Sequence, residues 1–460
     1  MNAPTYRLSA ILPLSIVAAL GGFLFGFDSG VINGAVNALA KEFGVAGFGT
    51  GLSVSLMLLG CAVGAFLAGT LADRFGRKPC MIATAVAFAI SGVGSAVAFG
   101  VADFIAWRLM GGFAIGAASV LAPAYISEIA PAELRGRLAS LQQLAIVVGL
   151  FASFLSNYAI AHLAGDAGQP FWLGYTAWRW MLGVEALPAL VYLVGALLVP
   201  ESPRWLAAHG RVDEARAIFV RLGESPDLAV AQTASELGRP RLADVLVPGT
   251  RRLLPIVWAG IWLSAFQQLV GINVVFYYGS TLWQAAGFDE SRALLINVIS
   301  GAVNIGSTLV AIALIDRLGR RPLLLAGSAG MAVSLGILAV VFGSAVQDAA
   351  GTLQLGKTEA MVALLAANGF ILAFGVSWGP AVWVLLGEMF PNRIRGSGLA
   401  IAAAVQWVAN FAISVSFPSL LASIGLGGAY GLYALAAAAS FVFVLRKVSE
   451  TRGRTLEQMG

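Results

Sequence analysis

The sequence predicts an all-α membrane protein in which twelve transmembrane helices form two parallel six-helix repeats, with short cytoplasmic helices between the halves. Hydrophobic residues make up 59% of the chain and charged residues 11%, with a mean hydropathy of +0.85. This composition excludes an ordinary soluble protein. Apolar runs of about 20 residues recur, which is the length that crosses a hydrocarbon core of about 30 Å as helix. Charged motifs at the ends of these runs occur twice, in corresponding places of the two halves.

Twelve apolar runs define the predicted spans. Several exceed the minimum length, so we expect those helices to tilt or to extend into water. The first run lacks a small-residue cleavage pattern before further spans begin, so we interpret it as a helix and not as a removable signal. The spans cover residues 8–36, 51–72, 80–101, 103–129, 138–161, 178–199, 254–286, 291–316, 322–345, 361–390, 397–422 and 428–446.

Positive charge is distributed unevenly between the two sides of these spans. The net charge is +5, with 28 Lys and Arg residues. Four of them lie at the ends that odd-numbered helices reach, Arg108 lies inside a span, and all the others lie on the opposite side. This asymmetry predicts a multi-pass protein of the cytoplasmic (inner) membrane with both termini in the cytoplasm, and it argues against a nucleic-acid partner. The four exceptions are Lys41, Arg179, Arg292 and Lys357.

Motifs for enzyme chemistry are absent from the sequence. It contains no phosphate-binding loop, no His-Glu-x-x-His zinc motif and no nucleophile elbow, so we expect neither an enzyme nor a cofactor. Cys61 and Cys80 fall at different predicted depths, which indicates neither a disulfide nor a metal site. The glycine-rich stretches at 60–64 and 112–116 lie inside spans without a preceding strand, so we interpret them as sites of close helix packing.

Three charged motifs repeat, which predicts two related halves with a substrate bound between them near the midplane. The offsets between the copies are 243, 260 and 249 residues. The pairs are Asp73–Lys78 with Asp316–Arg321, Glu128 with Glu388, and, more weakly, Pro200–Trp205 with Ser449–Gly453.

The acidic residues of these motifs predict ion pairs at the cytoplasmic face. Basic residues orient a membrane protein, but acidic residues contribute little to orientation, so their presence needs another explanation. We expect the ion pairs to hold one conformation and to break in another. The predicted network comprises Asp73, Arg77, Glu128 and Arg135 in the first half, and Asp316, Arg320, Glu388 and Arg395 in the second.

The repeats divide the chain into four parts. We expect six-helix bundles at 1–199 and 251–448, a cytoplasmic helical linker at 200–250 and a cytoplasmic tail at 449–460. In the linker, Ser202 followed by proline predicts a helix start, and Gly210 predicts its end. A second amphipathic helix is predicted at 213–222 and a third at 242–247.

The seventh span carries an unusual concentration of neutral polar side chains. Five of them fall within the twelve residues 267–278, and their spacing predicts that many share one helix face. A carboxamide offers donors and acceptors together, which matches the hydroxyl groups of a sugar. The alternative is that these amides only link neighbouring helices. The residues are Gln267, Gln268, Asn273, Tyr277 and Tyr278.

Together these motifs resemble the sugar porter family of the major facilitator superfamily. The resemblance rests on the paired loops at 73–78 and 316–321, on 200–205, on 267–278 and on Ser377–Pro380 with Trp383, and it covers nearly the whole chain. One departure is SETRG at 449–453, where the family has PETKG; this change affects only the cytoplasmic end. The implied monosaccharide ligands are Gln143, Gln267, Gln268, Asn273, Asn304, Trp383 and Gln406.

The predicted depths agree with most of this set. At 1.5 Å per residue, Gln267, Gln268 and Asn304 lie about 13 residues into their spans and fall in one middle layer, whereas Gln143 lies only about 5 residues in. Trp383 is expected to pack on the C–H face of a pyranose ring, the alternative being a membrane-facing side chain.

Two ionisable residues lie inside spans, where a charge is costly and indicates function. They are Asp28 in the first span and Arg108 in the fourth. The resemblance implies that this pair carries the proton of a proton-coupled porter. The alternative is a permanent ion pair that only links the two helices. Glu185 in the sixth span is a weaker third candidate.

The resemblance therefore implies a proton-coupled symporter for a hexose or pentose that works by alternating access. Its expected partners are a monosaccharide, protons and the lipid bilayer, and we expect a functional monomer. The same amides recur in porters for glucose, xylose, galactose and inositol, so the substrate stays open. The alternatives are a sugar or polyol uniporter of the same fold and a membrane sugar sensor that does not transport.

Overall fold

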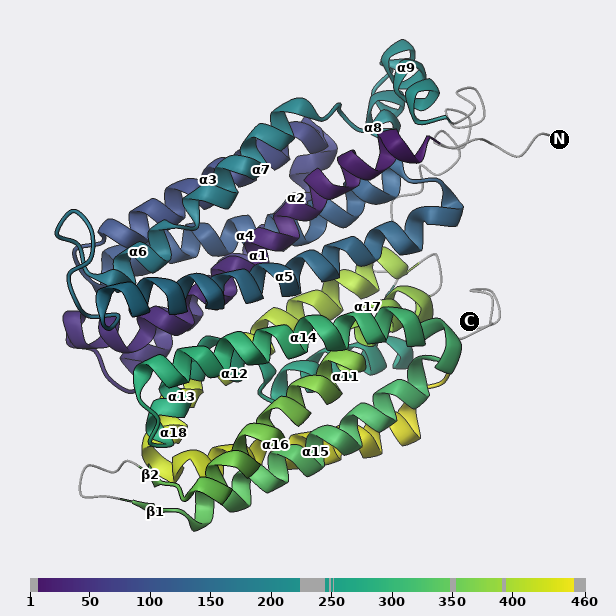
Figure 1. Cartoon of the computed structure of the whole chain (residues 1–460). Helices are drawn as coiled ribbons and strands as arrows, with labels where there is room; N and C mark the ends of the chain where they lie inside the picture. The colour runs from purple at the N-terminus through teal and green to yellow at the C-terminus, as the bar shows by residue number, and fades with distance from the viewer. Residues whose placement is uncertain are drawn as a thin grey trace. The chain divides into compact units, whose positions relative to one another are not determined.

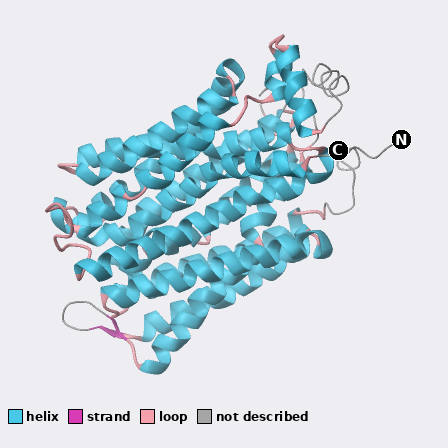
Figure 2. Cartoon of the chain, turned by 45° about the horizontal axis from the view of Figure 1, so that its top comes forward, coloured by secondary structure: helices cyan, strands magenta, loops and turns pink. Residues whose placement is uncertain are grey.

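The computed structural model describes residues 7–223, 245–247, 250, 252–347, 353–390 and 394–450. Within the helices, the side chains of residues 132–137, 139–140, 316 and 395–396 are not described. The described chain is helical except for loops and one pair of two-residue strands, β1 (Val346–Gln347) and β2 (Leu353–Gln354) (Figures 1 and 2).

The first six predicted spans are all helical. The sixth span consists of two shorter helices, which are separated by a turn at residues 184–185. The helices are α1 (Leu8–Phe43), α2 (Phe48–Phe75), α3 (Arg77–Val97), α4 (Val101–Ile129), α5 (Ala132–Ala164), α6 (Ala177–Gly183) and α7 (Ala186–Leu198).

The remaining spans include more interruptions. The seventh span consists of three helices and the tenth of two. The helices are α11 (Pro255–Leu269), α12 (Ile272–Tyr277), α13 (Gly279–Ala285), α14 (Glu290–Leu318), α15 (Arg320–Ser344), α16 (Lys357–Val376), α17 (Trp378–Met389) and α18 (Arg395–Lys447).

Eleven helical segments of the described chain are long and apolar enough to cross a membrane. One of them, α18, has 53 residues, which at 1.5 Å per residue is about 80 Å, far more than one bilayer requires. Gly425 interrupts it with φ 68° and ψ 179°, so α18 is two helices that meet at a kink. Counting both gives the twelve spans, and the kink falls in the predicted gap between residues 422 and 428.

Two of the three helices predicted for the linker are confirmed. Ser202 caps α8 (Pro203–Ala208) by accepting the Trp205 N–H, and Gly210, with φ 78°, follows its end. The second helix is α9 (Val212–Leu222). Half of the third predicted helix, at 242–247, lies outside the described residues, and in the other half Leu246 forms an antiparallel bridge with Leu253, which is not helical pairing.

The chain divides into two compact units that do not follow the order of the sequence. Unit 1 comprises Met1–Asp28, Leu59–Leu150 and Leu182–Arg239, and unit 2 comprises Ser29–Leu58, Phe151–Met181 and Pro240–Gly460. In unit 1, α3 packs against α4 and α7; in unit 2, α15 packs against α16 and α18.

Glycines in unit 1 allow α2 and α4 to approach closely. A Cβ atom on Gly64 would lie 2.1 Å from the carbonyl oxygen of Phe113, and one on Gly116 would lie 2.0 Å from that of Cys61. Neither glycine therefore tolerates a side chain. The sequence interpretation of these stretches as packing sites is confirmed.

We predict that Gly64→Ala lowers the melting temperature of the purified protein, because the added methyl overpacks the α2–α4 contact by about 1–3 kcal/mol. Gly69→Ala in the same helix is the matched control, since a Cβ there meets nothing within 4 Å. Alanine favours helix over glycine, so the control should melt at the same temperature or higher. Equal melting temperatures for the two variants would contradict this packing role.

Candidate functional site

A chain of hydrogen bonds joins the carboxamides of the seventh span to the tenth span within unit 2. Asn273 Nδ2 donates to Gln268 Oε1 at 2.6 Å, and Gln268 Nε2 makes a longer contact of 3.5 Å with Gln267 Oε1. Gln267 Nε2 donates to the carbonyl of Trp378 at 2.9 Å. Gln267 and Gln268 are only 2% and 4% exposed, so these bonds form away from water. The structure thus brings three of the predicted site residues into one polar cluster.

The expectation that these amides share one helix face is wrong. The first helix, α11, ends at Leu269, and Gly271 has φ 81°, a left-handed conformation that directs the chain into α12. A Cβ atom on Gly271 would lie 2.7 Å from the Tyr433 ring, so the turn requires glycine for both backbone and space. Asn273 meets Gln268 across this break, and not along a helix.

The break in the tenth span places the first carbonyls of α17 within reach of Gln267, whose Nε2 donates to Trp378 and makes a longer contact with Gly379. Ser377, with φ −125° and ψ −84°, separates α16 from α17. Trp378 anchors the start of α17 because its Nε1 donates to the Leu324 carbonyl at 3.1 Å and to Ser328 Oγ at 2.9 Å on α15. Two breaks in neighbouring spans are therefore held together by side chains.

The other predicted sugar ligands do not bond to this cluster among the described residues. Asn304 on α14 is 5% exposed, and a Cβ on Gly375 would lie 3.3 Å from its Oδ1, which places Asn304 beside the end of α16. Gln406 Oε1 is buried without a described hydrogen-bond partner. Trp383 on α17 is 41% exposed. Gln143 belongs to unit 1, where it lies half-buried on α5.

The two tyrosines of the central stretch bind the second part of unit 2. Tyr278 OH donates to the Ser414 carbonyl at 3.0 Å, and Asn410 Nδ2 donates to Tyr277 OH at 3.2 Å. Both partners lie on α18. These bonds fix α12 against α18, so for the tyrosines the alternative of interhelical links describes the observed contacts.

A second polar cluster in unit 2 was missed by the sequence interpretation. Asn33 on α1 donates through Nδ2 to the Phe276 carbonyl at 2.8 Å and accepts the Ser280 N–H at 3.0 Å and the Asn297 Nδ2 at 2.8 Å through Oδ1. Thr281 Oγ1 also donates to Asn37 Oδ1 at 2.7 Å. The sequence signal for this cluster was Asn33, a polar side chain inside the apolar first span. The cluster fastens the later half of α1 to α12, α13 and α14.

The predicted pair Asp28 and Arg108 is an ion pair inside unit 1. Arg108 Nη1 contacts Asp28 Oδ1, and the two residues are 1% and 0% exposed, respectively. Glu185, which is 1% exposed at the turn before α7, interacts electrostatically with both. Asp28 Oδ2 and Glu185 Oε1 have no hydrogen-bond partner among the described residues. Two buried carboxyl groups therefore share the field of one guanidinium, which makes Glu185 more prominent than the sequence indicated.

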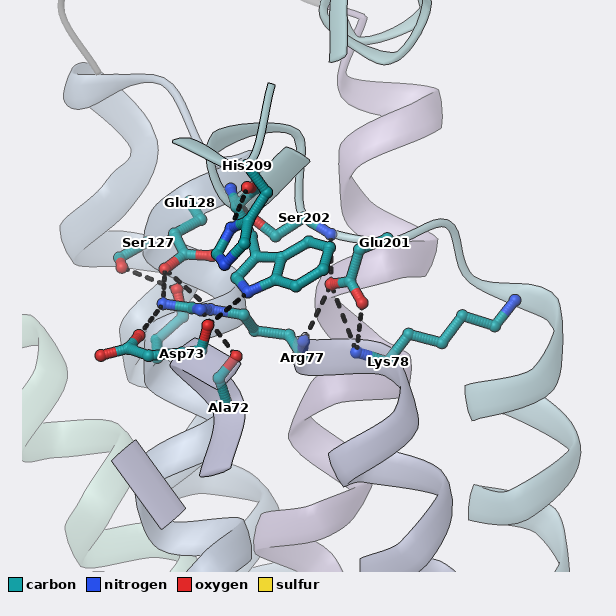
Figure 3. A network of polar contacts seen from close by, with 11 residues as sticks. Ala72, Asp73, Arg77, Lys78, Ser127, Glu128, Glu201, Ser202 and His209 are labelled. Atoms are coloured by element: carbon teal, nitrogen blue, oxygen red, sulfur yellow. Dashed lines mark hydrogen bonds and ion pairs between the residues drawn. The ribbon is translucent and has the colours of Figure 1, made fainter. Parts of the chain in front are cut away.

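The charge network at the end of unit 1 is built around Arg77 (Figure 3). Its guanidinium donates to Glu128 Oε1 at 2.8 Å, contacts Asp73 Oδ1 at 3.0 Å, and reaches the Ala72 carbonyl at 3.0 Å. Its backbone N–H donates to Glu201 Oε1 at 2.9 Å. Glu201 was not predicted as a member, although its position in a repeated motif was visible in the sequence.

Unit 2 contains a matching network around Arg320. Its Nη2 donates to Glu388 Oε1 at 2.7 Å, and its Nη1 reaches the Ile315 carbonyl at 3.1 Å. Glu450 accepts the backbone N–H groups of Arg320 and Arg321 at 3.1 and 2.9 Å, as Glu201 does for Arg77. The repeat seen in the sequence is therefore a repeat of contacts. The side chains of three predicted members, Arg135, Asp316 and Arg395, lie outside the described residues.

No group of three or more metal-ligating side chains occurs in the part of the chain that the structure describes. Cys61 and Cys80 are free cysteines, the first buried and the second half-buried.

Comparison with known proteins gives matches along almost the entire chain. The family model described as "Sugar (and other) transporter" matches residues 14–460. A glucose transport protein of Synechocystis sp. is 55% identical over 462 residues, which cover 99% of this chain and 98% of the relative. The D-xylose-proton symporter of Escherichia coli (strain K12) is 37% identical over 492 residues, covering 99% of this chain and 96% of the relative.

Solved structures match as completely. The inward-open structure of the xylose transporter XylE from E. coli aligns with a TM-score of 0.83 at 36% identity, covering 98% of this chain and 99% of that chain. The structure of XylE, a proton:xylose symporter of the major facilitator superfamily, bound to 6-bromo-6-deoxy-D-glucose, aligns with a TM-score of 0.78 at 36% identity, with 99% of each chain covered.

Proposed function

Because this chain belongs to the sugar transporter family of the major facilitator superfamily, we propose that it is a proton-coupled monosaccharide symporter, not an enzyme. One observation carries the proposal: the chain holds two buried polar groups of different kinds. A neutral carboxamide cluster lies in unit 2 and a buried ion pair lies in unit 1. The first suits a solute with many hydroxyl groups, and the second suits a proton. The relatives named for glucose and D-xylose favour a hexose or pentose.

The unused hydrogen-bonding groups of the amide cluster suit sugar hydroxyls. Asn273 is half-buried and donates one N–H to Gln268, which leaves its oxygen and its second N–H for a ligand. Gln406 Oε1 is a buried acceptor that a hydroxyl can satisfy. The half-exposed indole of Trp383 offers an apolar face to the C–H surface of a pyranose ring. Gln143 and Asn304 stay predicted ligands.

Charge balance explains how the ion pair can carry a proton. If Asp28 and Glu185 were both ionised around Arg108, the buried group would have a net negative charge, which is costly in a membrane interior. A proton on one carboxyl group removes that charge. We expect the two carboxyl groups to share this proton, so that loading it weakens the tie between Asp28 on α1 and Arg108 on α4. The helices can then rearrange around bound sugar.

We expect the paired charge networks to form in one state of alternating access and to break in the other. We expect the six-helix bundles at 1–199 and 251–448 to move as bodies, with the linker at 200–250 between them. Arg77–Glu128 and Arg320–Glu388 would hold the helix ends in one state and separate in the other. Each chain contains the amide cluster, the ion pair and both networks, so a monomer is sufficient for transport.

A uniporter of the same fold is the second candidate. The observation that favours it is the full burial of Asp28 and Arg108, because a permanent ion pair would also be buried. A non-transporting sensor is the third candidate, and any sugar uptake into vesicles excludes it.

We predict that Gln268→Ala weakens sugar binding about tenfold or more, because each unpaired hydroxyl costs about 1–3 kcal/mol. Gln267→Ala is the matched variant, one residue away: it should also lower the melting temperature, since it removes a buried hydrogen bond between α11 and α17. Titration calorimetry with a panel of monosaccharides and a thermal melt separate the two effects. Unchanged affinity of Gln268→Ala for every sugar would assign the cluster a purely structural role.

The second prediction concerns coupling. Asp28→Asn has no carboxyl group to cycle a proton, so in vesicles it should lose accumulation against a gradient while keeping sugar exchange. Asp103→Asn, the same acid-to-amide change near the start of α4, should accumulate sugar normally. Both sugar uptake and the accompanying change in internal pH are measured. Wild-type accumulation by Asp28→Asn would exclude the symport mechanism and favour the uniporter.

The last prediction concerns topology. From the charge asymmetry we infer that both termini face the cytoplasm. A tag placed after Gly460 and a cysteine introduced at Ser225 should react with impermeant reagents only in inverted or permeabilised membranes. Labelling of either from outside intact cells would reverse the orientation.

A further inference from the structure

Unit 2 contains a cavity of about 960 Å³ that is distinct from the amide cluster. Its walls come from α11, α17 and the last turns of α18. The cavity volume lies at the upper end of the range of about 300–1,000 Å³ that is typical of ligand sites. None of the predicted sugar ligands lines it. The cavity therefore needs an occupant other than the sugar.

The part of the cavity along α11 is lined by apolar side chains, and several of these side chains are exposed. Trp258, Trp262 and Phe266 follow one another at every fourth residue along α11, so they form a single stripe. The two tryptophans are 49% and 47% exposed, although Gln267 and Gln268 on the same helix are buried. On α18, Val442 faces the same cavity and is 46% exposed. Because these helices are long and apolar enough to cross a membrane, we expect these exposed side chains to contact lipid.

The mouth of the cavity is positively charged. Arg446 and Lys447, in the last turn of α18, line it and are exposed, and neither makes an ion pair with a described residue. Glu450 also lines the cavity, but its carboxylate accepts the backbone N–H groups of Arg320 and Arg321. Two cations are therefore available where α18 ends.

We propose that this cavity binds an anionic glycerophospholipid. Its acyl chains lie along the Trp258–Phe266 stripe, and its phosphate lies at Arg446 and Lys447, in the leaflet on the cytoplasmic side under the proposed topology. Basic pockets between transmembrane helices suit anionic lipid headgroups, and tryptophans suit the membrane interface. Two other uses of these cations require no bound lipid: they compensate the dipole of α18, and they contribute to the charge asymmetry that orients the protein.

The lipid would also contact the short helix α17. Leu385 and Met389 of α17 line the cavity, and α17 is separated from α16 by the break at Ser377. A lipid seated against α11, α17 and α18 therefore touches a segment whose position is not fixed by a continuous helix. This contact would couple the lipid composition of the membrane to the position of α17.

Native mass spectrometry of the full chain in mixed micelles tests the proposal, with phosphatidylglycerol and phosphatidylcholine titrated separately. Wild type should retain phosphatidylglycerol in preference to phosphatidylcholine. The double variant R446Q/K447Q should lose about thirtyfold in this preference, since each of the two cations near anionic lipid is worth about 1 kcal/mol. The control R216Q/R221Q removes the same charge from α9 and should keep the preference. A second variant, Ala439→Trp, fills the apolar part at an exposed position and should lower retention of phosphatidylglycerol.

Three results would overturn the proposal. One is an unchanged preference in R446Q/K447Q, and another is an equal loss in the α9 control, which would indicate general surface charge. The third is displacement of the lipid by millimolar glycerol 3-phosphate, which would indicate a soluble anion site. Sugar binding, measured in parallel, should be unchanged in all variants. Its absence in wild type would count against the proposed function and leave the lipid site standing.

Discussion

The satisfaction of backbone hydrogen bonds inside a membrane is the constraint on which the rest of this structure depends. A continuous helix satisfies its own backbone, but a broken one exposes N–H and C=O groups that no water can reach. Here the seventh and tenth spans are both broken, and Gln267 bonds the carbonyl of Trp378 across the two breaks. This bond fixes the end of α11 against the start of α17. The side chains proposed to bind the ligand therefore also hold the two broken spans in place.

The two polar centres differ in kind, and the difference matches the two solutes that we propose for them. A sugar is neutral and changes partners as it moves, so amides with spare donors and acceptors suit it without any change of charge. A proton changes the charge of its site, and only an ionisable group such as Asp28 can respond to it. The proposed role needs Arg108 beside Asp28, because a lone ionised carboxylate is costly to bury.

Much of the fold and part of the site could be predicted from the sequence, for identifiable reasons. Span positions follow from hydropathy, and the cap at Ser202 and the turn at Gly210 follow from local backbone preferences. The helix breaks were not predicted, because hydropathy alone does not show them, although Gly271 and the Gly379–Pro380 pair offered local signals. Similarly, Glu185 and Asn33 gain their meaning from neighbours distant in sequence, Asp28 and Ser280. The repeated contacts of Glu201 and Glu450 were accessible in principle, since both stand in a repeated motif.

The anchor at Trp378 makes α17 a lever. Its indole is bonded to α15 at one end of a helix of 12 residues, about 18 Å long, while Glu388 stands at the other end. A rotation about the anchored end displaces the far end most, by about 3 Å for every 10°. The Arg320–Glu388 ion pair holds that far end, where a given force exerts its greatest torque about the anchored end. One ion pair at the tip can thus restrain a rotation that would be hard to resist near the pivot.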